Sequence, residues 1–290
     1  MSRFRFLRHI AGDYRRKVLP APHQPHPQEW SPEQVTVAWL GHATVLINFY
    51  GVIILTDPVF FSRIGMRIGP LTLGPKRYIA CAMAPAELPK IDVLLLSHAH
   101  MDHLDLRSLR QITRDCTVIM AANTSDLVAR FRFREVHELA WNQERHFETS
   151  AGSLTIAAFQ LRHWGARMQW DVQRKYNAYV IERNGRRLCF CGDTARTDGR
   201  PIGSRGPVDL IMAPISAYNP WITNHCTPEE AIEMADEAGA RFIMPIHHET
   251  FKLSWEPMDE PIRRFQAALA NQRERTALTE IGQTFVLPEK

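Results

Sequence analysis

The sequence is poor in cysteine and has no long apolar run. It contains five cysteines, an odd number, and no two of them form a C-x-x-C pair. This scarcity argues against a disulfide framework and fits a reducing compartment. No apolar run approaches the roughly 20 residues that a membrane-spanning helix needs, and the N-terminus lacks the apolar core and cleavage site of a signal peptide. We therefore expect a cytoplasmic protein.

Neither charge nor repetition sets the sequence apart. The 35 Lys and Arg residues and 31 Asp and Glu residues give a net charge of +4, which is too mild to indicate a nucleic-acid partner. The sequence contains no internal repeat and no low-complexity tract. With 290 residues, of which 45% are hydrophobic, the chain is long enough to bury a full core.

Residues 1–34 form a basic N-terminal segment and a Pro-rich linker, and a single domain is expected over residues 35–290. In the first 17 residues, six Lys or Arg residues accompany one acid, and apolar residues recur at helical spacing at Phe4, Leu7, Ile10 and Tyr14. A basic amphipathic helix of this kind lies on anionic membrane surfaces. Residues 1–20 are therefore a candidate for peripheral contact with the inner face of the membrane. The alternative is an ordinary helix packed on the domain.

The densest cluster of metal-ligating residue types lies between residues 97 and 104. It reads H-x-H-x-D-H and contributes His98, His100, Asp102 and His103. It follows the largely apolar residues 91–96, which predict a buried strand, and α/β proteins place ligands at the carboxyl ends of strands. Imidazoles and a carboxylate suit a divalent metal such as zinc. The alternative is a His-rich surface loop.

Three further candidate ligands follow predicted strands. His163 follows a strand expected over 154–161, Asp193 follows the second arm of a hairpin predicted around Asn184-Gly185, and His247 ends a strand over 242–246. Each alone is as well explained as a hydrogen-bonded residue at the rim of a sheet. Combined with the H-x-H-x-D-H cluster they make five imidazoles and two carboxylates, which are enough for two metals.

Other positions are candidates for supporting roles. Asp57 ends a strand predicted over 52–57 and either holds the second nitrogen of a metal-bound histidine or caps the turn. His42, on the turn after the first strand, either lines the site or bonds that turn. Residues 60–89 are a long irregular connection with apolar side chains between 60 and 73, which is typical of a lid or substrate wall or of a loop packed on itself.

These motifs resemble the metallo-β-lactamase fold superfamily and, within it, the N-acyl-phosphatidylethanolamine-hydrolysing phospholipase D-like branch. The resemblance covers residues 35–265. The shared stretches are WLGHAT at 39–44, TDP at 56–58, GPKR at 74–77, His163-Trp164, GDT at 192–194, HxxPEEA from His225 and HxxTF from His247. The chain departs from the branch pattern at the spacers Ala99 and Met101, at residues 80–85, and at His248-Glu249.

The resemblance implies an α/β fold, an αββα four-layer sandwich with the site at one edge. It implies that the first metal is held by His98, His100 and His163. It implies that the second is held by Asp102, His103 and His247, with Asp193 bridging. Two divalent ions are expected, zinc in the first place, with manganese or iron as alternatives.

The same resemblance suggests a hydrolase in which a hydroxide shared by the two metals attacks the substrate. Asp102 would also orient this nucleophile. His225 would donate a proton or contact the substrate. Asp57, His42 and His248 would support the ligands or line the substrate site.

Three functions follow from this site. The first is a phosphodiesterase acting on a small-molecule or lipid-like phosphodiester, which the apolar residues between 60 and 73 favour. The second is a lactonase of the sugar-phosphate lactonase type, which the basic residues Arg63, Arg67, Lys76 and Arg77 favour. The third, of another class, is a membrane-peripheral or regulatory protein with a vestigial site. The presence of all seven ligands argues against this third function.

Overall fold

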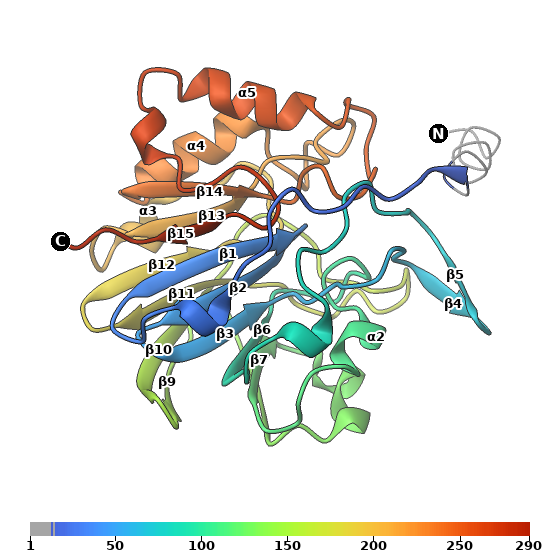
Figure 1. Cartoon of the computed structure of the whole chain (residues 1–290), viewed down its shortest axis with the longest axis horizontal. Helices are drawn as coiled ribbons and strands as arrows, with labels where there is room; N and C mark the ends of the chain where they lie inside the picture. The colour runs from blue at the N-terminus through green and yellow to red at the C-terminus, as the bar shows by residue number, and fades with distance from the viewer. Residues whose placement is uncertain (1–12, 14) are drawn as a thin grey trace.

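Two β-sheets stacked face to face form the centre of the protein (Figure 1). The structure is a computed structural model, and it describes residue 13 and residues 15–290. Helices lie on the outer faces of both sheets, so the layers follow the order helix, sheet, sheet, helix. The expected αββα sandwich is therefore confirmed.

The first sheet has seven strands in the order β15-β1-β2-β3-β6-β7-β8. The bounds of these strands are β1 Val35–Gly41, β2 Thr44–Phe49, β3 Val52–Thr56, β6 Val93–Leu96, β7 Thr117–Ala121, β8 Glu135–Leu139 and β15 Thr284–Val286. Strand β6 runs parallel to both β3 and β7. It is buried along its whole length, as expected for a central parallel strand.

The second sheet has six strands in the order β14-β13-β12-β11-β10-β9. Their bounds are β9 Glu144–Thr149, β10 Gly152–Phe159, β11 Ala178–Arg183, β12 Arg186–Phe190, β13 Leu210–Pro214 and β14 Phe242–Ile246. Strands β12, β13 and β14 are parallel, so their carboxyl ends meet at one edge. A separate two-stranded hairpin is made by β4 Met66–Ile68 and β5 Leu71–Leu73.

Short helices cover the sheets. The α-helices are α2 Leu106–Leu109, α3 Arg200–Gly203, α4 Pro228–Glu237 and α5 Glu260–Ala268. The 3-10 turns are η1 Pro27–Glu29, η2 Pro85–Glu87, η3 Ser125–Leu127, η4 Ala129–Phe131 and η5 Arg273–Arg275. Helices α4 and α5 share a buried apolar cluster with the outer face of the second sheet. Among the described residues, no helix combines the length and the apolarity needed to cross a bilayer.

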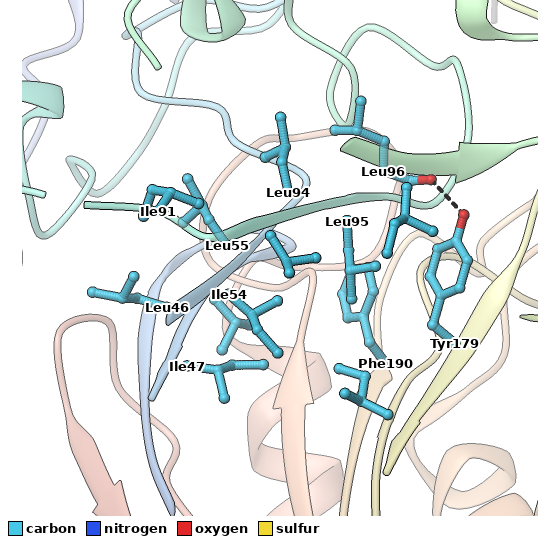
Figure 2. Packing of buried hydrophobic residues seen from close by; sticks show 14 of the residues in the cluster. Leu46, Ile47, Ile54, Leu55, Ile91, Leu94, Leu95, Leu96, Tyr179 and Phe190 are labelled. Carbon is cyan, nitrogen blue, oxygen red and sulfur yellow. Dashed lines mark hydrogen bonds between the residues drawn. The ribbon is translucent and has the colours of Figure 1, made fainter. Parts of the chain in front are cut away.

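The main core lies between the two sheets (Figure 2). Leu94 and Leu96 of β6 belong to the same buried cluster as Tyr179 and Phe190 of the second sheet. The Tyr179 hydroxyl also donates a hydrogen bond of 2.9 Å to the Leu96 carbonyl. This bond satisfies the polar end of a fully buried aromatic ring and ties the sheets together two residues before the H-x-H-x-D-H cluster begins.

The predicted strands around the site are present. The Asn184-Gly185 hairpin pairs Arg183 with Arg186, and both turn residues have positive φ, as a two-residue turn requires. Residues 125–132 form the two 3-10 turns η3 and η4, and helix α2 after the histidine cluster is only one turn long. Such short segments derive their conformation from packing.

The N-terminal linker lies along the domain. Arg16 donates hydrogen bonds of 2.6 Å to the carbonyls of Lys76 and Arg77, and its guanidinium stacks 3.7 Å from the centre of the Tyr78 ring. Leu19 bridges Ile79 in parallel. The amphipathic helix proposed for residues 1–20 lies largely outside the described residues, because residues 1–12 and 14 are not among them.

Candidate metal centre

The histidine cluster begins where β6 leaves the first sheet. The Ser97 backbone N–H donates to Asp57 Oδ1 at 2.7 Å, which extends the pairing of β6 with β3 by one residue. The chain then turns, with the His103 N–H bonded to the His100 carbonyl at 3.1 Å. Asp105 ends the turn by accepting the Arg107 and Ser108 N–H groups at the start of α2. The cluster is therefore fixed at both ends.

One group of candidate ligands consists of His98, His100, His163 and Asp193, whose ligand atoms all lie within 4.8 Å of one another. His98 Nε2 lies 2.8 Å from His100 Nδ1, and His163 Nε2 lies 3.3 Å from the same atom. Only one hydrogen can lie between two imidazole nitrogens, so three nitrogens converging in this way are arranged for a shared cation.

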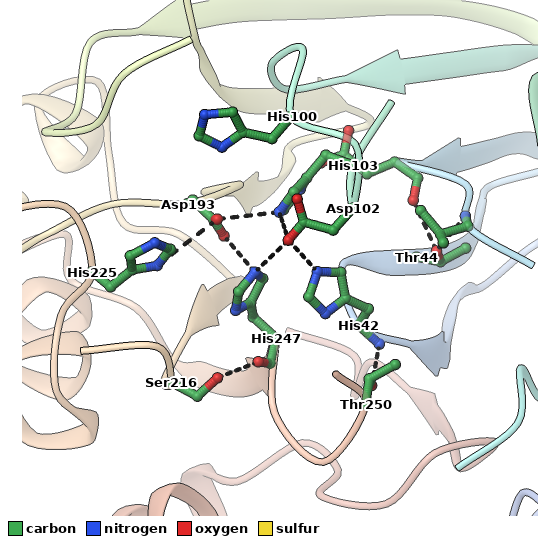
Figure 3. Close-up of polar contacts among 12 residues, drawn as sticks. His42, Thr44, His100, Asp102, His103, Asp193, Ser216, His225, His247 and Thr250 are labelled. Atoms are coloured by element: carbon green, nitrogen blue, oxygen red, sulfur yellow. Dashed lines mark hydrogen bonds and ion pairs between the residues drawn. The ribbon is translucent and has the colours of Figure 1, made fainter. Parts of the chain in front are cut away.

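A second group consists of His42, Asp102, His103 and His247, again within 4.8 Å (Figure 3). Asp102 Oδ2 lies 3.0 Å from His42 Nε2, 3.6 Å from His247 Nε2 and 3.7 Å from His103 Nε2. Asp102 therefore stands at the centre of three imidazoles. His42 was expected only in a supporting role, but the structure places it among these potential ligands.

Asp193 lies between the two groups. Its Oδ2 is 3.2 Å from His103 Nε2 and 3.9 Å from His163 Nε2, and its Oδ1 is 3.2 Å from His247 Nε2. Gly192 allows Asp193 to approach the histidine cluster. Its φ is +60°, and a Cβ at this residue would lie 2.7 Å from Ser97 Cβ. Any other residue at 192 would push the second sheet away from the H-x-H-x-D-H cluster.

Hydrogen bonds orient the imidazoles from behind. Asp57 Oδ2 accepts from His103 Nδ1 at 2.7 Å and from the Ser97 hydroxyl at 2.5 Å. The Asn224 carbonyl accepts from His163 Nδ1 at 2.9 Å. In both histidines the Nε2 atom thereby faces the carboxylates, and in the neutral His163 it is left without a proton, which is the usual arrangement for a metal-ligating imidazole.

The two sheets meet directly at the site. The His247 backbone N–H donates to the His42 carbonyl at 3.0 Å, and the Asn177 N–H donates to the Ser97 carbonyl at 2.9 Å. The His42 N–H in turn donates to Thr250 Oγ1 at 2.9 Å. His42 and His247 both have positive φ, a conformation that non-glycine residues adopt mainly where the surroundings impose it, as at active sites.

Burial lowers the pKa of most imidazoles in the cluster. The pKa values of His42, His100 and His225 fall to about 3, because a buried imidazolium loses its hydration and faces neighbouring imidazoles. These three side chains are therefore neutral at physiological pH, which is the form that binds metals or forms hydrogen bonds through a free nitrogen.

Two imidazoles behave in the opposite way. Burial also disfavours the charged forms of His103 and His247, but the carboxylates of Asp193 and Asp102 outweigh it. These carboxylates raise the pKa of His247 to about 9 and that of His103 well above its usual range. The pKa of each carboxyl is correspondingly lowered, because the neighbouring imidazoles outweigh the effect of burial.

Buried polar atoms that make no hydrogen bond show that the cluster fits metal ions. His103 Nε2, His247 Nε2 and Asp193 Oδ1 are buried and make no hydrogen bond, although they approach opposite charges at 3.2 Å. Buried polar atoms are nearly always bonded, so this concentration needs compensation, and divalent cations supply it. The donor set of imidazole nitrogens and carboxylate oxygens is one that zinc, manganese and iron accept.

The remaining predicted residues divide into two cases. The His225 imidazole joins the cluster, with Nδ1 3.8 Å from Asp193 Oδ2 and its ring 5.1 Å from that of His163. His248 points elsewhere: it is buried against Trp39 with ring centroids 4.4 Å apart and belongs to no group of potential metal ligands among the described residues.

Sequence reasoning missed Ser97, Asn224 and the ring of Trp164. Ser97 connects Asp57 to His98, whose Nδ1 lies 2.8 Å from its hydroxyl, and Trp164 packs edge-on against His100 with centroids 4.8 Å apart. Ser97 and Trp164 could have been found from the sequence, because each is adjacent to a predicted ligand. Asn224 acts through its backbone carbonyl, which no side-chain pattern reveals.

A two-sheet sandwich with this set of histidines and aspartates at one edge defines a class of metal-dependent hydrolases. The family described as the Beta-lactamase superfamily domain matches residues 53–248, which contain the seven predicted ligands. The chain belongs to the metallo-β-lactamase superfamily.

Relatives and solved structures agree with this assignment. The chain is 29% identical over 260 residues to an uncharacterized protein of Mycobacterium tuberculosis, covering 86% of this chain and 68% of that protein. It is 33% identical over 230 residues to N-acyl-phosphatidylethanolamine-hydrolyzing phospholipase D 1 of Caenorhabditis elegans, covering 74% and 64%. The chain thus spans about two thirds of the length of these relatives.

Among solved structures, the fold is similar to that of Igni18, a metallo hydrolase from the archaeon Ignicoccus hospitalis. The TM-score is 0.67 at 18% sequence identity, and the match covers 89% of this chain and 100% of that one. At this identity the likeness concerns the fold alone.

Proposed function

We propose that the protein is a binuclear zinc phosphodiesterase whose substrate is a lipid-like phosphodiester. The observation that carries the proposal is the pair of adjoining ligand groups joined through Asp193. His98, His100 and His163 would hold one metal, and Asp102, His103 and His247 the other, with His42 as an additional donor. Two such ions supply Lewis acidity and a water of lowered pKa.

The protein's own side chains contribute orientation and hydrogen bonding. Asp57 and Asn224 hold His103 and His163 with their Nε2 atoms facing the site. Burial lowers the pKa of His225 to about 3, which favours the neutral imidazole at physiological pH and argues against a role as general acid. Of its two expected roles we therefore favour contact with the substrate, through donation of a hydrogen bond to a phosphoryl oxygen.

Apolar side chains next to the site support a lipid-like substrate. Val59, Ile64 and Phe251 form a separate buried cluster, and the Phe251 ring lies 5.1 Å from that of His42. The similarity to a nematode phospholipase D that hydrolyses N-acyl-phosphatidylethanolamine points the same way.

The test is hydrolysis of N-acylated glycerophosphoethanolamines of increasing acyl-chain length by the zinc-loaded protein. A chromogenic phosphodiester and a panel of sugar-phosphate lactones are run beside them. Because each buried methylene contributes about 0.8 kcal/mol, longer chains should lower KM until further methylenes find no apolar surface to contact. Faster turnover of the lactones would favour the lactonase alternative instead. Failure to bind stoichiometric metal would favour a vestigial site.

A further inference from the structure

Exposed large apolar side chains gather on segments that follow site-bearing strands. Among the described residues, ten of the twelve exposed large apolar side chains lie on these segments. They are Met66, Ile68, Leu71 and Leu73 after β3, Trp164, Trp170 and Val172 after β10, Trp221 and Ile222 after β13, and Trp255 after β14. Soluble proteins rarely concentrate such side chains on one region without a partner.

Two of the tryptophans contact histidines of the metal centre, and a third is bonded to the loop that carries one of these histidines. The ring of Trp164 packs against His100. The Trp221 carbonyl accepts the His225 backbone N–H at 2.9 Å, and the Trp255 N–H donates to the Asn219 carbonyl at 2.8 Å in the same loop. Trp164, Trp221 and Trp255 are 46%, 52% and 54% exposed respectively, so about half of each side chain is open to solvent.

The hairpin β4–β5 presents one continuous apolar face. Its register pairs Met66 with Leu73 and Ile68 with Leu71, and because side chains two apart or directly paired share a face, all four lie on the same side. Thr72 lies on the opposite side and accepts a hydrogen bond of 2.9 Å from Arg107 of α2.

The apolar face of the hairpin therefore points away from the domain. Figure 1 shows the hairpin projecting from the sandwich. The exposed fractions of the four side chains range from 49% to 61%, so the described residues leave about half of each side chain open to solvent.

The surroundings of the hairpin are cationic. Residues 58–86 contain four Lys or Arg residues, of which Arg77 alone is fully buried, and no Asp or Glu. The linker beside them carries Arg15, Arg16 and Lys17, of which Arg15 and Lys17 are exposed, and Arg16 is bonded to the Lys76 carbonyl. Apolar side chains set among cations complement a surface that is anionic outside and apolar beneath.

We propose that this face docks on an anionic phospholipid bilayer, with the β4–β5 hairpin inserted among the lipids. Tryptophan side chains concentrate at the level of the lipid headgroups. In the docked protein, Trp164, Trp221 and Trp255 would therefore lie at that level, beside the metal centre. Docking in this orientation turns the metal centre toward the membrane. The proposal goes beyond the proposed function, since it does not require that the lipid be hydrolysed.

The test uses the full-length, zinc-loaded protein and vesicles of equal parts phosphatidylcholine and phosphatidylglycerol, without N-acylated lipid. Binding is measured by co-sedimentation. The variant Ile68→Ser/Leu71→Ser removes the two side chains at the hairpin tip, and Val286→Ser, 46% exposed on β15, is the matched control. Because all three are exposed, circular dichroism should show unchanged folding.

We expect the wild type and Val286→Ser to bind equally, and the hairpin variant to need about tenfold more lipid. Added salt and pure phosphatidylcholine should both weaken binding. No binding by the wild type, or equal binding by the hairpin variant, would overturn the proposal. A third result would also overturn it: the wild type does not bind vesicles, and the hairpin variant differs from it in oligomeric mass. That result would assign the face to contact with a second copy of the chain.

The vesicle result separates this proposal from the proposed function. The chromogenic phosphodiester is soluble and has no acyl chain for an apolar wall to contact. Its turnover should be the same in the wild type and the hairpin variant, since the tip touches no candidate ligand. Vesicle binding without phosphodiesterase activity would leave the docking surface in place and reject the enzymatic proposal, and the reverse result would reject only the docking surface.

Discussion

Replacing Asp57 by Asn should weaken metal binding without touching a ligand. Asp57 is completely buried and accepts from His103 Nδ1 at 2.7 Å. In Asp57→Asn, rotating the amide to keep its oxygen on the Ser97 N–H turns the –NH₂ group toward His103 Nδ1–H, so two donors face each other. The imidazole relieves this conflict by moving its proton to Nε2, the atom that faces Asp102 and Asp193.

The magnitude follows from the loss of one correctly oriented imidazole. Mutating a group that orients a metal ligand costs about 10- to 100-fold in metal affinity, which corresponds to about 1.4 to 2.8 kcal/mol. Loss of the charge-assisted hydrogen bonds to Ser97 and His103 should also lower the free energy of unfolding by about 1.5 to 3 kcal/mol.

Asp92→Asn is the matched control. Asp92 is buried, precedes β6, and accepts the Ile53 N–H at 2.9 Å, just as Asp57 accepts the Ser97 N–H at the other end of the same strand pair. It contacts no imidazole of the site. Its replacement should therefore lower the free energy of unfolding to a similar degree and leave zinc affinity unchanged.

The assay is competition for zinc with a chromogenic chelator, with denaturant unfolding measured on the same samples. We expect Asp57→Asn alone to lose affinity for one of the two ions. A folded Asp57→Asn protein that retains wild-type zinc affinity would refute the orientation argument, as would an equal loss of affinity in Asp92→Asn.

Four further outcomes are expected. His42→Ala should lower the affinity for one zinc ion about tenfold, checked by elemental analysis after dialysis; unchanged content at limiting zinc would show that His42 is no ligand. Asp193→Ala should abolish most activity while circular dichroism stays unchanged, and a fully active variant would remove Asp193 from the site. Zinc binding to metal-free protein at neutral pH should release protons, because the raised pKa values of His103 and His247 keep them protonated and ligation needs neutral imidazoles. The contribution of His247 should fade as the pH rises past about 9; calorimetry in buffers of different ionisation enthalpy measures the release, and none at neutral pH contradicts the prediction. His225→Gln should lower kcat without moving the acidic limb of the pH profile, since His225 has a pKa of about 3; a moved limb would restore it as a proton donor.

The sequence by itself determined the strands that carry the predicted ligands, and the superfamily. Ligands in H-x-H-x-D-H are close along the chain, so their proximity hardly depends on the rest of the fold. His163, Asp193 and His247 each follow a strand whose apolar pattern is local. The start of α4 was equally readable, because the capping box between Thr227 and Glu230 is a short-range interaction.

Only the tertiary structure decided how the two sheets complete the site. His42 is 60 positions from Asp102 in sequence and approaches it at 3.0 Å because β1 and β14 are joined through the His247 N–H. Asp57 could have been a turn cap, and only its distance to His103 shows that it orients an imidazole. Likewise His248 looked equivalent to His247 until the chain placed it against Trp39. These outcomes depend on side chains brought together by sheet stacking, whose geometry local propensity and spacing do not encode.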